Sequence, residues 1–357
     1  HPRRPRDEKG RLQHQLQARL AMPQFNLGGL LAREPLVGRM TVHGSLYSTI
    51  SQRKIQDNTV MVDIADLEFK GYRYDTIRVA GLLRGKNFNG RLRSDDPNLK
   101  VLVDGSVNWR DSIPRYDVTT RLTHVDLAKL HFNERDTLSQ FSGRLVVKAG
   151  GRSLDDLNGR IHLSNATYLY NDKQIKARSV TVEGVNSADR KFVQMHSDFA
   201  DATFRSRTGY RTIYEYLRRS ALRYLPLIGR SEDAAWQQQH RTVAVADEYS
   251  VLDLKIHDIS PISDAISSGL QVANNSTFNL TFNPVSDHLS MKAVSDYIEH
   301  RNILVTRLHA TASNQNDSLQ TYVRSEDLYL GAIHMPQFSL SAGAKLGRMQ
   351  LSLGFND

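Results

Sequence analysis

The alternation of apolar and polar residues at every second position is the feature that most constrains this chain. Between residues 99 and 110 the odd positions carry Leu, Val, Val, Gly, Val and Trp, and the even positions carry Lys, Leu, Asp, Ser, Asn and Arg. Successive side chains of a β-strand point to opposite faces of its sheet. This stretch is therefore predicted to be a strand with one apolar face.

The same period of two returns along most of the sequence. It is found in residues 58–69, 75–83, 115–125, 143–149, 159–170, 174–185, 277–283, 302–312 and 348–355. The connections between these stretches are short and rich in turn residues, as at 95–98, 150–151, 171–172 and 283–284. We therefore expect a mostly β fold built on a long, antiparallel-rich sheet.

A short motif, apolar-x-Gly-(Arg/Ser)-apolar, recurs within this pattern. Its copies are LVGRM (36–40), VHGSL (42–46), FNGRL (88–92), VDGSV (103–107), FSGRL (141–145) and LNGRI (157–161). A glycine at the same level of successive strands lets a sheet curl along a line. The motif thus favours a sheet that bends into an open, U-shaped groove instead of closing on itself. Alternatively, Gly-Arg only marks the start of strands after turns.

The period changes to that of a helix at residues 208–225, and Pro226 ends the pattern. The expected apolar face consists of Tyr210, Ile213, Tyr214, Leu217, Ala221, Tyr224 and Leu225, and arginines occupy much of the remaining surface. We expect this amphipathic helix to pack on its own protein; the alternative is that it lies on an anionic membrane. A second short helix and a linker are expected at 231–248.

These patterns divide the chain into three segments. Residues 1–206 are expected to form a first β-groove segment, residues 207–248 a helical insertion with a linker, and residues 249–357 a continuing β-groove segment.

Several classes of chemistry have no support in the sequence. The chain has no cysteine, which excludes disulfides and thiolate chemistry, and its 13 histidines are not spaced as metal ligands. No nucleophile elbow, dinucleotide-binding, P-loop or zinc-protease motif is found. Residues 196–198 (His-Ser-Asp) are consecutive on a strand, so they cannot converge as a triad. We expect no enzyme activity, no metal and no cofactor.

The net charge of +9 comes mainly from two basic stretches, at the start of the chain and at 205–230. Aromatic residues are not interleaved with these stretches in the manner of an RNA-recognition sheet, so no nucleic-acid partner is expected. No stretch of about 18 apolar residues suggests a membrane helix. The opening HPRRPRDEKG suggests an interior boundary, with any export or anchor segment outside this sequence.

Three stretches resemble the AsmA-like proteins, and among them the TamB-like translocation and assembly module proteins of the Bacteroidetes type. They are HSDFADATF (196–204) followed by the helix that ends in YLPLIG (224–229), DISPISDAISSGLQVANNSTFNLTFN (258–283), and RLTHVDLAKL (121–130). The likeness covers most of 100–357; the family's inner-membrane anchor and extreme C-terminal domain have no counterpart. It implies a periplasmic β-rich trough between inner and outer membranes, linked to lipid transport and outer-membrane biogenesis.

Alternation alone predicts which side chains face the groove. They are Val60, Val62, Ile64, Ile77, Val79, Val101, Val103, Val107, Leu145, Val147, Ile161, Leu163, Phe278, Leu280 and Phe282. Lys100, Asp104 and Lys148 are expected on the opposite face. Because exposing an acyl chain to water costs ~0.8 kcal/mol per CH₂, a 16-carbon tail needs on the order of 12 kcal/mol of shielding, which an apolar floor could supply.

The sequence therefore suggests a groove segment that carries phospholipid acyl chains between the two membranes, in a protein anchored to the inner membrane. The alternative is a scaffold or chaperone that engages outer-membrane β-proteins, or an outer-membrane assembly protein, by strand addition.

Overall fold

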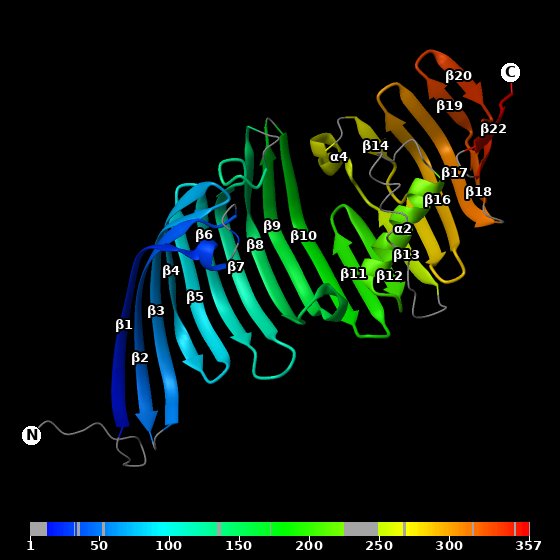
Figure 1. Cartoon of the computed structure of the whole chain (residues 1–357). Helices are drawn as coiled ribbons and strands as arrows, with labels where there is room; N and C mark the ends of the chain where they lie inside the picture. The colour runs from blue at the N-terminus through cyan, green and yellow to red at the C-terminus, as the bar shows by residue number, and fades with distance from the viewer. Residues whose placement is uncertain are drawn as a thin grey trace, which may run out of the picture. The chain divides into compact units, whose positions relative to one another are not determined.

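The structure is a computed structural model of the chain (Figure 1). It describes residues 13–31, 33, 36–51, 54–133, 137–171, 173–224, 249–266, 269–315, 318–345 and 348–356. The chain divides into two compact units. Unit 1 contains residues 1–152 and 159–179, and unit 2 contains residues 153–158 and 180–357.

Unit 1 is built from long antiparallel strands, each paired with the next along the chain. They are β1 (Gln13–Asn26), β2 (Arg39–Ser51), β3 (Lys54–Phe69), β4 (Tyr72–Arg84), β5 (Asn87–Asp96), β6 (Leu99–Asn108), β7 (Arg115–Asp126), β8 (Ser139–Gly150), β9 (Asn158–Tyr170) and the first half of β10 (Lys173–Asn186). Figure 1 shows these strands bending along their length. A short helix, α1 (Leu27–Leu31), follows β1.

Unit 2 begins with a 3-10 turn, η1 (Leu154–Asp156), and takes up the chain again in the second half of β10. Its strands are β11 (Lys191–Ser197), β12 (Ala200–Ser206), β13 (Ser250–Ile256), β14 (Leu270–Val272), β15 (Thr277–Asn283), β16 (His288–His300), β17 (Ile303–Gln315), β18 (Ser318–Arg324), β19 (Asp327–Leu330), β20 (Ile333–Pro336), β21 (Ser339–Lys345) and β22 (Arg348–Gly354). The helices among its described residues are α2 (Tyr210–Tyr224) and α4 (Ser260–Ile266).

The expected fold class is confirmed: the described residues form an antiparallel, 22-stranded sheet that remains open, with β1 and β22 as edge strands and one amphipathic helix inserted. Outside the expected helical insertion, the described residues also form two short helices, α1 and α4. No described helix has the length and apolar content needed to cross a membrane. The segment boundaries predicted at 206/207 and 248/249 both fall inside unit 2, and 225–248 lies outside the described residues.

Glycines meet side by side where three neighbouring strands approach closely. Gly81 of β4 lies opposite Gly90 of β5, which lies opposite Gly105 of β6. A Cβ atom at Gly90 would lie 2.6 Å from the Ala80 carbonyl oxygen and 2.7 Å from the Phe88 ring. Two copies of the recurring motif thus stand at one level, as predicted, and there a side chain would force the strands apart.

The other copies do not join this line. Gly44 lies opposite Val62, Gly143 lies opposite Leu122, and Gly38 precedes β2. Gly159 has a φ of +138°, which residues with a side chain rarely adopt. Its backbone conformation, and not a shared level in the sheet, therefore explains the glycine. The motif therefore marks one shared level only at β5 and β6.

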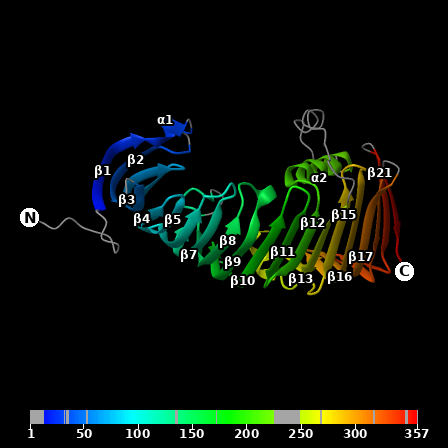
Figure 2. The ribbon, with the colours of Figure 1, turned by 90° about the horizontal axis from the view of Figure 1, so that it is seen from below.

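Helix α2 packs on one face of the unit 2 sheet, as predicted. Tyr216 is fully buried and stacks on Phe282 of β15 with ring centroids 5.7 Å apart. Its hydroxyl donates a hydrogen bond of 2.9 Å to the His288 carbonyl. Ile213 completes the buried contact with Leu280 and neighbouring side chains of the sheet. Figure 2 shows α2 lying across the strands of this unit.

The predicted apolar face of α2 was wrong in detail. Tyr214 is 62% exposed, and Ala221 is exposed as well. Tyr210, Ile213 and Leu217 contact the sheet cluster as predicted, and Tyr216, which the prediction left out, joins them by stacking on Phe282. The helix is thus rotated by part of a turn from its expected orientation. The side chain of Tyr224, Leu225 and the second helix expected at 231–248 lie outside the described residues.

We predict that Gly90→Ala lowers the free energy of unfolding by ~1–3 kcal/mol, because the new methyl group overpacks the approach between β4 and β5. The matched control is Gly44→Ala, in the same motif, where a Cβ would lie 3.6 Å from the Leu20 Cβ. That change should shift stability by less than ~1 kcal/mol. Urea denaturation measures both, and equal effects would contradict the close approach.

We predict that Tyr216→Ala destabilises unit 2 by ~3–5 kcal/mol, because it removes a fully buried ring. Tyr214→Ala removes the same side chain from the exposed side of α2 and should change stability by at most ~0.5 kcal/mol. Thermal unfolding followed by near-ultraviolet circular dichroism distinguishes the two. A larger loss at Tyr214 would show that the helix packs through the face predicted from the sequence.

Candidate apolar face for lipid

The predicted groove residues of β3 to β8 fall on one face of unit 1, which we call the inner face. Cross-strand pairing aligns Val62 with Val79, Ile64 with Ile77, and Val103, through Thr120, with Leu145. Val60 lies opposite Gly81, and Val147 lies opposite Val118. Both pairs stand at the level of the three neighbouring glycines described above. Val101 lies at the level of Ile77. Val107 lies opposite Tyr116, one level beyond the three glycines. A slip of one residue would have placed them on the other face.

The predicted residues of β9 belong to the same face. A Cβ atom at Gly143 would lie 3.4 Å from a methyl carbon of Leu163. Gly143 shares its side of β8 with Leu145, since side chains alternate along a strand. Leu163, and Ile161 two residues before it, therefore extend the inner face across β9.

The inner face of unit 1 is neither a packed interior nor fully exposed. Every predicted residue from Val60 to Leu163 is half-buried. A side chain in a single sheet layer is shielded by neighbours on its own face, but it stays open from above. The half-burial is the result expected of an apolar face that solvent or a ligand can reach.

Residues that lie opposite each other on neighbouring strands form one level of the sheet. On the inner face of β2 to β8, four successive levels contain no charged residue. The levels contain apolar residues, glycines and a few uncharged polar residues such as Asn58, Ser94 and Thr120. Four levels span about 20 Å along the strands, and seven strands span about 29 Å across them. The resulting area, on the order of 600 Å², equals the largest apolar patches of ordinary monomers.

The opposite face of unit 1, the outer face, carries the charges. Arg91 pairs with Asp104 at 2.6 Å, and Lys148 pairs with Asp117 at 3.6 Å. Lys100 is exposed on the same side. These ion pairs are well exposed and contribute little stability individually. Their role is to make this face soluble while the inner face stays apolar.

The three groove residues predicted in β15 have a different environment. Leu280 is 9% exposed and Phe282 is 1% exposed, and both lie beneath α2. Phe278 is half-buried against the same cluster. In unit 2 these side chains form a packed core with the helix and do not face an open slot. The sequence pattern alone could not show this, because the helix is distant along the chain.

Sequence reasoning missed β5 as part of the inner face. Phe88 and Leu92 flank Gly90 with a period of two and lie opposite Val107 and Val103. The signal was present in the motif FNGRL. It was weak because only three positions, Phe88, Gly90 and Leu92, follow the apolar phase before Ser94 ends it.

A buried polar network lies at one end of the inner face. Asp96 is 1% exposed. Its carboxylate accepts hydrogen bonds from the Tyr72 hydroxyl at 2.8 Å, the Asp75 amide at 3.0 Å and the Asn98 amide at 2.8 Å. Burial, together with the hydrogen bond to Asp96, raises the pKa of Tyr72 to about 12. Tyr74 beside it joins Val125 and Leu130 in the main buried cluster of unit 1.

A second polar cluster lies on unit 2. The carboxylate of Asp201 bonds His196 Nδ1 at 3.0 Å and His257 Nε2 at 3.0 Å. Burial opposes ionisation of Asp201, but these hydrogen bonds outweigh it and lower the pKa of the carboxyl. Ser197 instead donates to the Ala200 carbonyl. His196 and Ser197 thus bond partners other than each other.

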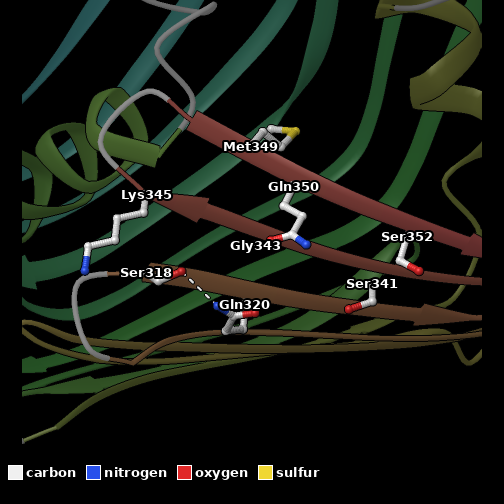
Figure 3. A pocket seen from close by; sticks show the side chains of 8 residues that line it. All are labelled: Ser318, Gln320, Ser341, Gly343, Lys345, Met349, Gln350 and Ser352. Atoms are coloured by element: carbon white, nitrogen blue, oxygen red, sulfur yellow. Dashed lines mark hydrogen bonds between the residues drawn. The ribbon is translucent and has the colours of Figure 1, made fainter.

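A polar hollow of about 550 Å³ lies over β18, β21 and β22 (Figure 3). Its lining includes Gln320, Ser341, Gln350 and Ser352, and Ser318 accepts a hydrogen bond of 2.8 Å from Gln320. The hollow holds no arrangement of nucleophile and base. It is unsuited to acyl chains because its lining is mostly hydroxyl and amide groups.

No group of histidine and carboxylate side chains within the described part of the chain is arranged to hold a metal ion. No protein-family model, curated protein or solved structure matches this chain.

We predict that Asp96→Ala lowers the free energy of unfolding of unit 1 by ~3 kcal/mol, because it leaves buried donors without an acceptor. The neighbouring Asp95 is the control, since it pairs with Arg93 in an exposed position. Asp95→Ala should change stability by at most ~0.5 kcal/mol. Guanidinium denaturation measures both; similar losses would show that the network is not a structural anchor.

Proposed function

We propose that unit 1 is a segment of a lipid-transfer groove, whose inner face shields the acyl chains of phospholipids. The observation that carries the proposal is the uncharged, half-buried inner face backed by a charged outer face. Acyl chains need only continuous apolar contact, so no specific polar site is required. Lipid headgroups would stay at the margin in water.

The biological setting that we propose is that of the AsmA-like and TamB-like proteins. The chain would act in the periplasm, within a protein anchored to the inner membrane, and would carry phospholipid between inner and outer membranes without catalysis. The support is the sequence resemblance together with an antiparallel sheet that has one apolar face.

A second candidate function is strand addition to outer-membrane β-proteins. The edge strand β22 favours it, because Met349, Leu351 and Leu353 are 53%, 58% and 65% exposed on one side of the strand. An edge strand also offers unpaired backbone groups to another strand. Native mass spectrometry of detergent-free protein separates the two: stoichiometric phospholipid supports the groove, and a bound β-strand peptide without lipid supports strand addition.

We predict that a photocrosslinking amino acid at Val103 or Leu145 labels lipid in cells, because both side chains face the proposed acyl position. The same probe at Lys100, Asp104 or Lys148 should label lipid several-fold less, since these residues lie on the outer face. Equal labelling of the two sets would contradict the proposal.

We also expect Val103→Arg to block lipid binding while leaving unit 1 folded. The charge would cost several kcal/mol among acyl chains, but water can reach it when no lipid is bound. Asp104→Arg places the same side chain on the outer face and serves as the control. Circular dichroism reports folding; unfolding by Val103→Arg in a parent that binds no lipid would make Val103 an ordinary core residue.

A further inference from the structure

Four arginines stand at one level of the outer face of unit 1, and we call them the arginine row. They are Arg78 of β4, Arg93 of β5, Arg121 of β7 and Arg144 of β8. Arg78 lies directly opposite Arg93, and Arg121 lies directly opposite Arg144. Leu102 of β6 lies between the two pairs, opposite both Arg93 and Arg121.

Like charges opposite each other on neighbouring strands destabilise a sheet. At the next two levels of the outer face this arrangement is avoided: Arg91 lies opposite Asp104, and Lys148 lies opposite Asp117. The arginine row departs from this pairing of opposite charges at two places, where Arg78 faces Arg93 and where Arg121 faces Arg144. A role in folding does not account for it.

The row is only partly neutralised by the protein itself. Asp63 lies 3.8 Å from Arg78, and Asp95 lies 2.7 Å from Arg93. Among the residues that the structure describes, no carboxylate forms an ion pair with Arg121 or Arg144. The nearby acids on these strands, such as Asp117, are committed to other cations. The β7–β8 end of the row is therefore a place for an anion from outside.

A hollow of about 340 Å³ adjoins the row. Its lining includes the cations Arg93, Lys100 and Arg121 with Leu102 and Thr123, and also Asp95, whose carboxylate is paired with Arg93 at 2.7 Å. Leu102 is half-buried, whereas the three cations are exposed. The hollow thus combines a small apolar contact with a cationic rim. This is the composition of a protein–protein contact, in which arginine is enriched around an apolar centre.

We propose that the arginine row and its hollow bind an acidic, extended segment of a partner protein. Guanidinium groups pair with carboxylates in bidentate geometry, and an apolar side chain of the segment would enter the hollow over Leu102. The row spans four strand spacings, about 19 Å. About six extended residues cover that distance. The segment would therefore carry carboxylates on both sides of one apolar residue.

Two other anionic partners fit less well. A membrane surface is broad and offers no side chain to fill a hollow of this size. Single-stranded nucleic acid binds sheets through bases stacked on aromatic rings. The residues flanking the row on these strands include Thr76, Ala80, Thr119 and Val146, none of which can stack.

The experiment measures fluorescence anisotropy of a labelled hexapeptide, Glu-Asp-Leu-Glu-Asp-Glu, with the full chain at low and at physiological salt. We expect Arg121→Gln combined with Arg144→Gln to weaken binding at least ten-fold. The matched control combines Arg84→Gln with Arg91→Gln, which removes the same charge from residues paired with Asp57 and Asp104. It should change the affinity less than two-fold.

Two further variants test the hollow. Replacing the peptide's leucine by glycine, or Leu102 by serine, should each weaken binding several-fold at both salt concentrations. Absence of peptide binding, or equal loss in both arginine double variants, overturns the proposal. Tighter binding of anionic phospholipid vesicles or of a single-stranded oligonucleotide, lost in the Arg121/Arg144 variant, would assign the row to that polyanion instead. Circular dichroism confirms that the variants fold.

Discussion

Pairing between antiparallel strands is the interaction on which the rest of unit 1 depends. The backbone hydrogen bonds fix which residues stand opposite each other, and the alternation of side chains then sends every second residue to the same face. With this register, valines, isoleucines and glycines share the inner face, and arginines and aspartates share the outer face. A shift of one residue in any strand from β3 to β8 would place charges among the apolar side chains.

The two units differ in how far the apolar side chains on one face of the sheet are covered. In unit 2, α2 covers the apolar side chains, and Tyr216 and Phe282 form a buried aromatic contact. In unit 1 the predicted groove residues remain half-buried, and full burial is concentrated near Tyr74, Val125 and Leu130 with the Asp96 network beside them. Unit 1 therefore draws its anchoring from one end of the sheet and leaves the rest of the inner face accessible.

The sequence predicted most of the sheet because a period of two needs only local information. It located strands such as β6 and β15 within a few residues and assigned Val103 and Leu145 to one face. It missed β5, whose apolar phase is only three positions long and includes a glycine. It also chose Tyr214 over Tyr216, because a ring's burial depends on the sheet residue that it meets. The arginine row was also invisible, since opposite partners on neighbouring strands are set by register and not by spacing along the chain.

An accessible apolar face has an energetic consequence for ligand binding. At ~25 cal/mol per Å², drying an area on the order of 600 Å² is worth at most on the order of 15 kcal/mol, and well under half of this is left because neighbouring side chains already cover most of each residue. The acyl chains that we propose as ligands would remove their own surface from water as well, so both partners would contribute. Loss of motion on binding offsets much of the gain. In the lipid-transfer function that we propose, the remaining attraction would be spread evenly along the strands, so that an acyl chain would slide from one set of side chains to the next without leaving a deep local minimum.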